Sequence, residues 1–425
     1  MPILWKGKII GSNEFRDSFY LILLQGVNQL LPLIVMPYLM IKLGTYGYGH
    51  VGYSLSVIQY MIIIVDFGFN FSATKKIAIV GDNRVKRSRI FWATVAAKTF
   101  LLTISMLIML ILITCVGTFR LYRTAIIATV PMLIGSTYTF MWLYQGIGKI
   151  RLFSILNTIS KITLLPLIFI YVKTPDDYVV AAFLQSAVFL FTAIASGIHI
   201  YYKKWIIKQR PTMRDIKNEI SDSFPLFLSS ASTSVYTQLT VVIIGFFCAT
   251  ETVGLYTSAE RIMRAACFVL YTPLSQVYFP KISALASKNR AEAKNMFKRA
   301  KIIIMSVMTL VCVALLVCGK WGPVILGSDY NGIDKYLTIF AFVPFAIGFG
   351  GIYGQMGLIA LGNKYTIRSF RNTYFTAAVF SICATLFVTP IFYAYGACFV
   401  TAATEIIVAL LMYYKYKKHI LLCSY

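Results

Sequence analysis

The stretch RVKRSRIFWATVAAKTFLLTISMLIMLILITCVGTFR (residues 84–120) decides the fold class of this chain. Four basic residues precede an apolar run at 91–116, which a single charge, Lys98, interrupts before the next charge at Arg120. A bilayer core of roughly 30 Å is crossed by about 20 helical residues, because each residue of a helix rises about 1.5 Å. A strand of a membrane barrel would instead alternate apolar and polar residues over about ten positions. The run therefore predicts a transmembrane α-helix.

Runs of the same kind recur along the whole chain. Hydrophobic residues make up 58% of the 425 positions and charged residues only 13%, whereas ordinary soluble domains have about 25% charged residues. The mean hydropathy is +0.74. We predict an all-α polytopic membrane protein with about twelve transmembrane helices, at 19–41, 50–72, 91–116, 124–147, 153–172, 178–201, 224–247, 254–279, 302–318, 336–360, 373–393 and 396–414.

Lysine and arginine residues indicate how these helices are oriented. Of the 40 in the chain, thirty fall in the alternate segments that include both termini, and six fall in the segments between them. Loops on the cytoplasmic side of a membrane carry the excess of basic residues. We therefore expect both termini and the basic loops to lie in the cytoplasm. The net charge of +25 reflects this topology rather than a nucleic-acid-binding face, because the basic residues form short, separate clusters.

The two halves of the chain are similar in sequence. A shift of 205 residues places Gly49 on Gly254 and Lys76 on Lys281, at equivalent points of predicted spans. The shift covers an even number of helices, so the two copies keep the same orientation, as in transporters whose lobes rock around a central site. We therefore expect two six-helix lobes around a central cavity.

The charged segment between the sixth and seventh spans sets the expected lobe boundaries. We assign residues 1–210 to the amino-terminal lobe and 211–223 to a cytoplasmic linker. Residues 224–425 form the carboxy-terminal lobe, which ends in a short cytoplasmic tail.

The loops and motifs exclude several classes of function. The longest predicted outer loop, 319–335, leaves no room for the catalytic domain that an enzyme acting on lipid-linked sugars needs. The sequence contains no phosphate-loop, Cys-x-x-Cys or His-Glu-x-x-His pattern, and its three histidines lie far apart. We expect no enzymatic activity, no cofactor and no metal site. Most of the eight cysteines lie in apolar runs, where we interpret them as packing residues, and we expect no cleaved signal peptide.

Ionisable residues inside the predicted spans are the first candidates for a functional site. A charged side chain at bilayer depth is costly, so it normally faces the interior of the bundle or a water-filled cavity. We expect the cations to line a substrate-binding lumen, and Asp66, Glu405 and Glu260 to act in proton coupling or gating. The cations are Lys98, Lys161, Arg261 and Arg264.

Simpler roles stay open for several of these residues. Lys98 lies close enough to the interface for its long side chain to reach the headgroups. Glu260 precedes Arg264 by four positions on one helix face, so these two residues can pair with each other. Arg261 fits an interfacial position equally well, and Asp66 fits a hydrogen bond to a neighbouring helix end.

Uncharged polar and aromatic residues in the spans complete the candidate lumen. They are Gln25 and Asn28 on one face of the first helix, Trp142 and Gln145 on the fourth, and Asn157 on the fifth. Sugar hydroxyls need such hydrogen-bonding and stacking partners. The alternative is hydrogen bonding between helices for the amides, and anchoring at the membrane interface for the tryptophan.

Three stretches near the amino terminus carry a family resemblance. They are LLQGVNQLLPLIVMPYLMIKLG (23–44), TYGYGHVGYS (45–54) and DFGFNFSATKKIA (66–78). Together they resemble the amino-terminal signature of O-antigen flippases of the Wzx type, in the multidrug/oligosaccharidyl-lipid/polysaccharide exporter superfamily. The chain length, the twelve spans and the two lobes are similar to this family over the whole sequence.

The resemblance implies a function and a location. It implies that the protein moves undecaprenyl-diphosphate-linked O-antigen or polysaccharide repeat units from the cytoplasmic to the periplasmic leaflet of a bacterial inner membrane. It also implies alternating access and a cationic lumen. The expected partners are the lipid-linked oligosaccharide, membrane lipids and other membrane proteins of polysaccharide assembly, with no nucleic acid.

Three alternatives stay open at this point. A multidrug exporter of the same superfamily would bind cations and favour acidic residues in its lumen. The spans here instead hold four cations against two anions, Asp66 and Glu405, when Glu260 is set aside as a partner of Arg264. A flippase for peptidoglycan precursors would share the fold and the charge, but tends to have two further helices. A membrane-embedded polysaccharide polymerase is disfavoured by the short outer loops.

The distribution of basic residues predicts the membrane topology. Thiol labelling of single-cysteine variants in intact cells should place 73–90, 202–223 and 280–301 inside, and 117–123 and 319–335 outside. A basic segment that reacts with an impermeant reagent from outside would contradict this topology.

Overall fold

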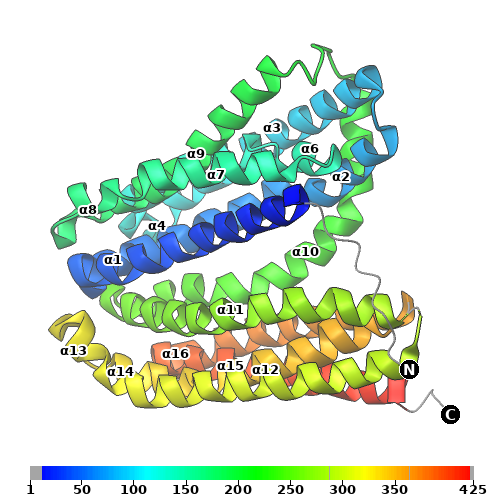
Figure 1. The fold of residues 1–425 in the computed structure, drawn as a ribbon. Helices are drawn as coiled ribbons and strands as arrows, with labels where there is room; N and C mark the ends of the chain where they lie inside the picture. Colours follow the sequence, from blue (N-terminus) through cyan, green and yellow to red (C-terminus); the bar gives the residue numbers. More distant parts are fainter. Residues whose placement is uncertain (1–11, 287, 363, 422–425) are drawn as a thin grey trace.

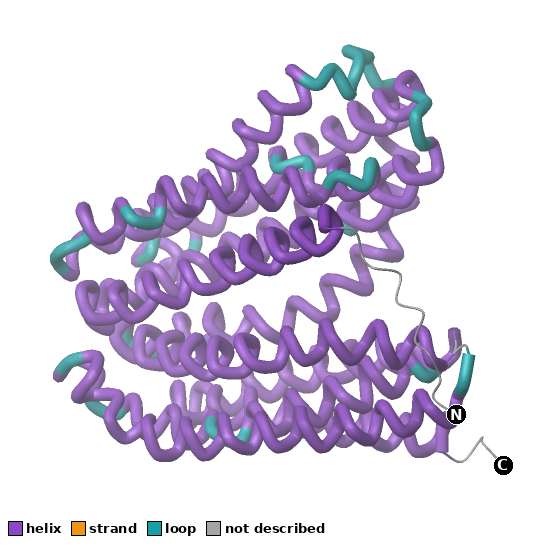
Figure 2. The backbone as a smooth tube through the Cα atoms, viewed as in Figure 1, coloured by secondary structure: helices purple, strands orange, loops and turns teal. Residues whose placement is uncertain are grey.

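The structure, a computed structural model, describes residues 12–286, 288–362 and 364–421 of the chain. These residues form helices joined by short turns, with no strand among them (Figure 2). The predicted all-α class is therefore confirmed.

The amino-terminal half contains α1 (Ser12–Asp66), α2 (Phe69–Val80), α3 (Arg84–Cys115), α4 (Gly117–Leu121), α5 (Arg123–Tyr138), α6 (Met141–Gly146), α7 (Ile150–Leu164), α8 (Leu167–Tyr171), η1 (Pro175–Asp177) and α9 (Tyr178–Tyr202).

The second half begins with α10, a long helix that follows the segment between the lobes. The elements of this half are α10 (Met213–Phe247), α11 (Thr250–Ala286), α12 (Arg290–Cys318), η2 (Gly319–Trp321), α13 (Gly322–Leu326), η3 (Ser328–Tyr330), α14 (Ile333–Phe340), α15 (Val343–Gly351), η4 (Ile352–Ala360), α16 (Lys364–Tyr416) and η5 (Lys417–Leu421).

The helices account for the predicted spans. Eight helical stretches among the described residues are long and apolar enough to cross a membrane. Tyr365–His419 contains two predicted spans, and Leu31–Val80 contains the second span and residues 31–41 of the first. The helices in these stretches are kinked, α1 at Gly44 with φ 61° and α16 at Tyr393 with φ 52°. Together with the earlier part of α1, and with α10 and α11, the eight stretches cover all twelve predicted spans.

Several helix boundaries differ from the prediction, and two of the differences have a clear local cause. The second predicted span, 50–72, is interrupted after Asp66 because Phe67 and Gly68 both adopt positive φ, and α2 starts only at Phe69. Such backbone conformations break the hydrogen-bond ladder of a helix.

The other difference concerns α10, which starts eleven residues before the predicted span at 224. Its start is fixed by a capping box: Asp215 N donates to Thr212 Oγ1 at 3.2 Å, and Thr212 N donates to Asp215 Oδ2 at 3.0 Å. Most of the predicted linker is therefore helical.

The helices form two groups with α10 between them (Figure 1). One group contains α1 to α9, which hold the first six predicted spans, and the other contains α11 to α16, which hold the last five; the seventh predicted span lies in α10 between them. The groups lie close together at the end that holds α4, η1 and α13, which we call the closed end. They diverge toward the end that holds the loops 81–83 and 203–212 and the start of α12, which we call the basic end (Figure 1).

At the closed end, α1 and α11 are in contact through their backbones. A Cβ atom on Gly254 would overlap the carbonyl oxygen of Thr45, and a Cβ on Gly49 would overlap that of Thr250. Only glycine permits this approach, because any larger residue would push the two helices apart. The two glycines are the same pair that the sequence repeat aligns, one in each lobe.

Tyrosine hydroxyls add hydrogen bonds between the lobes at this end. Tyr330 in η3 donates to the carbonyl oxygens of Met40 at 3.1 Å and Gly44 at 3.2 Å. Tyr122 lies between α4 and α5, and its hydroxyl donates to Thr250 Oγ1 at 3.3 Å. These contacts join α1 and α5 of one lobe to α11 and η3 of the other.

At the basic end, the first turns of α10 are fastened to the amino-terminal lobe. Lys76 Nζ lies 2.9 Å from Glu219 Oε1 and 2.8 Å from Asp222 Oδ2. Arg89 is paired with Asp215 at 2.8 Å, and its hydrogen bond holds the pKa of Asp215 at about 2, below the ordinary value for an aspartate. The start of α10 therefore belongs structurally to α2 and α3.

The contact between α1 and α11 predicts that Gly254→Ala separates the lobes at the closed end. The added methyl cannot fit against Thr45, and overpacking of this kind costs about 1–3 kcal/mol. We expect a lower thermal unfolding temperature in detergent. Gly197→Ala in α9 is the matched control, because the nearest atom to its Cβ would be 3.6 Å away, and it should be neutral or slightly stabilising. Equal stability of the two variants would contradict the proposed packing.

Candidate functional site

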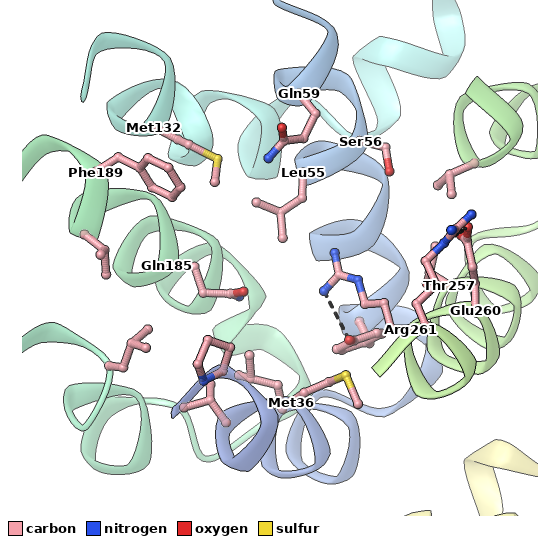
Figure 3. Close-up of a pocket in the computed structure, with 18 of the residues that line it drawn as sticks. Met36, Leu55, Ser56, Gln59, Met132, Gln185, Phe189, Thr257, Glu260 and Arg261 are labelled. Atoms are coloured by element: carbon pink, nitrogen blue, oxygen red, sulfur yellow. Dashed lines mark hydrogen bonds and ion pairs between the residues drawn. The ribbon is translucent and has the colours of Figure 1, made fainter. Parts of the chain in front are cut away.

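A cavity of about 450 Å³ lies between the two lobes, next to the contacts of the closed end. Its walls come from α1, α5, α7, α9, α10 and α11, so both lobes contribute (Figure 3). The lining residues are Pro32, Val35, Met36, Leu39, Tyr48, Leu55, Ser56, Gln59, Met132, Lys161, Leu165, Gln185, Val188, Phe189, Val241, Thr257, Glu260, Arg261 and Arg264.

Helix α11 supplies most of the charge in this cavity. Thr257, Glu260, Arg261 and Arg264 recur at intervals of three and four residues, which places them on one face of the helix. Glu260 is buried and Arg264 is partly buried; Arg264 Nε donates to Glu260 Oε1 at 2.9 Å. The predicted pairing of these two residues is therefore confirmed. Although they pair with each other, both residues also line the cavity.

Arg261 connects the two lobes from within the cavity. Its guanidinium donates to the Tyr48 hydroxyl at 3.1 Å and lies 5.3 Å from the centre of the Tyr48 ring (Figure 3). Tyr48 belongs to α1 and is fully buried. An arginine over an aromatic ring gains electrostatic attraction from the ring face. Arg261 thus contributes both a positive charge in the cavity and a contact across the interface.

Lys161 brings the third cation into the cavity from α7 of the amino-terminal lobe. The sequence predicted Lys161, Arg261, Arg264 and Glu260 as site residues, and the structure brings all four to one cavity. The lining thus holds three cations and one carboxylate, from two lobes.

The remaining wall is apolar with a few uncharged polar groups. Met36, Met132 and Phe189 represent its apolar part, and Gln59 and Gln185 point into the space from α1 and α9 (Figure 3). The sequence prediction missed both glutamines. The signal that selected Gln25, an amide inside an apolar span, was also present at these two positions.

Lys98 and Asp66 lie outside the cavity and pair with each other. Lys98 is only 1% exposed, and its Nζ lies 2.9 Å from Asp66 Oδ1. It also donates to the carbonyl oxygen of Ser136 at 3.2 Å. The pair joins the end of α1 to α3 and α5. The side chain of Lys98 thus points toward Asp66 and Ser136, and the roles expected of Lys98 and Asp66 in binding and coupling stay predictions.

The other predicted site residues lie elsewhere. Glu405 is buried within α16, 7% exposed, and Trp142 packs on Phe91 in the core of the amino-terminal lobe. Asn157 accepts a hydrogen bond from Thr192 at 3.5 Å, between α7 and α9. Gln145 is exposed at the basic end.

Two predicted residues, Gln25 and Asn28, have side chains that lie outside those the structure describes. No cluster of metal-ligating residues occurs in the described part of the chain.

The arrangement is suited to an anionic, partly polar ligand. Arginine and lysine bind phosphate oxygens through charge-assisted hydrogen bonds, and arginine can do so through two parallel bonds. The glutamines and Ser56 offer donors and acceptors to uncharged hydroxyls. The apolar wall can face the hydrocarbon of an amphiphile.

Several solved membrane transporters have a fold similar to that of this chain. The chain matches an inward-facing multidrug resistance MATE family transporter of the MOP superfamily with a TM-score of 0.70 at 15% identity, over 92% of this chain and 94% of the other. It matches the lipid II flippase MurJ, in an inward closed conformation, with a TM-score of 0.73 at 13% identity, over 93% of this chain and 87% of the other. An outward-facing MATE structure matches less well, with a TM-score of 0.55 at 16% identity, over 95% of this chain and 94% of the other.

Sequence comparisons give relatives over almost the whole chain. A "Putative O-antigen transporter" of Escherichia coli (strain K12) is 29% identical over 93% of this chain and 95% of its own length. A protein of the same name from Shigella dysenteriae is 28% identical over 93% of this chain and 98% of its own length. The family model described as "Polysaccharide biosynthesis protein" matches residues 15–286, well over half of the chain. This multi-pass membrane protein therefore belongs to the polysaccharide biosynthesis protein family.

Proposed function

We propose that this protein is a flippase for lipid-linked polysaccharide repeat units of the O-antigen type. The observation that carries the proposal is the cavity between the lobes, where α7 and α11 bring three cations together. A repeat unit linked to undecaprenyl diphosphate presents an anionic diphosphate, sugar hydroxyls and a hydrocarbon chain. The cavity offers a complementary surface to each of these parts. The family membership and the names of the two relatives support the same class of substrate.

In this proposal the basic end faces the cytoplasm and the repeat unit enters from there. Basic loops mark the cytoplasmic side of membrane proteins, and the lobes diverge at the basic end (Figure 1). The better match to an inward-facing than to an outward-facing transporter supports this assignment. The lobes then rock about α10, opening the closed end to the periplasm and closing the basic end.

A multidrug exporter is the second candidate, because MATE transporters share the fold. The binding site of such an exporter is expected to be rich in acidic residues, because these attract a cationic drug. The described cavity instead contains Lys161, Arg261 and Arg264 with Glu260 as its only carboxylate. The excess of cations favours the anionic substrate.

Deletion of the gene in its host tests the proposal directly. Lipid-linked repeat units should accumulate on the cytoplasmic leaflet, and surface polysaccharide should disappear. Resistance to cationic drugs should not change. Normal surface polysaccharide in the deletion strain, or increased sensitivity to drugs alone, would refute the proposed substrate.

Lys161→Ala is predicted to reduce export without reducing the amount of protein. Loss of a hydrogen bond to a charged group costs about 1.5–3 kcal/mol, or roughly ten- to a hundredfold in binding. Lys161→Arg keeps the charge and should restore part of the export. The measurement is surface polysaccharide at matched protein level in the deletion strain.

Lys98→Ala is the matched control, because it removes another lysine from a predicted span, one that lies outside the cavity. It should reduce protein abundance instead, since Asp66 then loses its cation. Export that is normal in Lys161→Ala at wild-type abundance would remove Lys161 from the substrate site.

Alternating access predicts that the basic end narrows when the substrate binds. Spin labels at Asp82 and Lys288, which are exposed on opposite lobes at this end, report the separation. In lipid vesicles their distance should shorten after lipid-linked repeat units are added. Undecaprenol without diphosphate is the control and should leave the distance unchanged. A distance that does not respond to the substrate would exclude the rocking mechanism.

A further inference from the structure

His50 lies at the closed end, in α1, within the interface of the two lobes. It is 1% exposed and follows Gly49, which packs against the backbone of Thr250 in the other lobe. Three tyrosine rings surround the imidazole. Tyr178 stacks on it with ring centres 4.5 Å apart, and Tyr46 and Tyr122 approach edge-on at 4.8 and 4.9 Å.

Neither ring nitrogen of His50 has a hydrogen-bond partner among the described residues. The neighbouring titratable groups are the three phenols and, across the interface, Glu251 in the first turn of α11, which acts on His50 electrostatically without forming an ion pair in the described structure. In the adjoining η1, Asp177 is engaged elsewhere, because its carboxylate accepts hydrogen bonds from the backbone of Lys173 and Thr174 and from the Thr174 hydroxyl.

This environment favours a neutral imidazole while the lobes are packed together. A protonated imidazole has two N–H donors and a full charge, and neither donor would find an acceptor here. The face of the stacked Tyr178 ring can return about 0.5–2 kcal/mol through cation–π attraction. Burial of a charge without a hydrogen bond costs several kcal/mol, so the neutral form prevails.

Opening of the closed end would expose His50 to water. Its neighbours Gly49 and Tyr122 both contact Thr250 across the interface, so separation of the lobes removes one side of its surroundings. We propose that His50 is a proton-binding site of the closed end, which releases its proton when the lobes pack together and takes one up from the outer compartment when they separate. The proposal rests on the alternating access proposed above, but it requires no substrate.

The consequence is that acid on the outer side stabilises the open form of this end. A ligand shifts a two-state equilibrium toward the state that binds it better, and here the ligand is the proton. An imidazole in water has a pKa of about 6.5, so an open form that alone accepts the proton should gain about tenfold in its ratio to the closed form between pH 7.5 and 5.5.

Two native cysteines allow the test. Cys115 and Cys318 are exposed at the ends of α3 and α12, one on each lobe at the closed end. A variant that keeps only these two cysteines, spin-labelled in lipid vesicles, reports the separation of the lobes at the closed end. We expect the population with the longer distance to increase about tenfold, relative to the shorter, from pH 7.5 to pH 5.5.

His50→Gln should abolish this pH response, and His50→Phe, which fills the aromatic surroundings without a titratable group, should do the same. His199→Gln is the matched control. His199 also stacks on a tyrosine, Tyr144, but lies in α9 toward the basic end with a hydrogen bond of 2.8 Å to the Tyr144 hydroxyl. This variant should keep the full response. Thermal unfolding confirms that each variant is folded.

The possible outcomes separate the two proposals. A closed end that opens with the same pH dependence in His50→Gln as in the wild type would overturn the role of His50. Opening that is independent of pH in the wild type would do so as well, while leaving the flippase function intact. A closed end that opens under no condition, with or without lipid-linked repeat units, would overturn both.

Discussion

The contact between the backbones of α1 and α11 is the constraint on which the rest of the structure depends. Gly49 and Gly254 bring the two helices together so closely that a single methyl group would not fit. Lipid hydrocarbon provides no hydrophobic force between helices, so small residues that allow close approach dominate such interfaces. This contact closes one end of the space between the lobes and leaves Tyr48 and Arg261 at the boundary between the interface and the cavity.

Charges inside the membrane fall into two groups with different surroundings. Lys98 and Asp66 neutralise each other at a junction of three helices, where their cost is offset by a short ion pair. Lys161, Arg261 and Arg264 face a common space and outnumber their single carboxylate there. Both groups lie within predicted spans, so the presence of a charge in a span does not by itself distinguish an ion pair between helices from a charge that lines the cavity.

The fold was largely predictable from the sequence, because apolar run length and the placement of basic residues are local properties. The all-α class and the twelve spans followed from the apolar runs, and the two lobes followed from the sequence repeat. The site was predictable only in part. Arg261, Arg264 and Glu260 share one helix face, which can be read from their spacing in the sequence. Lys98 and Asp66 lie on different helices and are 32 residues apart in the sequence, so no local spacing indicates that they pair.

The missed features had signals of different strength. The early start of α10 was readable, since Thr212 and Asp215 form an ordinary capping box. The amides Gln59 and Gln185 were visible as polar residues in apolar spans, but many such residues bond between helices instead. Which of these amides faces the cavity depends on how the two lobes pack together, and no local sequence pattern predicts that packing.

The anchoring of α10 has a mechanical consequence. Residues 211–223 were predicted as a linker between the lobes, yet Lys76 and Arg89 fix the segment from Asp215 to Asp222 to the amino-terminal lobe. The later part of the same helix packs on α16 in the other lobe. The segment that joins the lobes in sequence is therefore held by one lobe, and the helix crosses to the other lobe without a break. Under the proposed alternating access, motion of one lobe against the other would bend α10 itself rather than turn about a flexible loop.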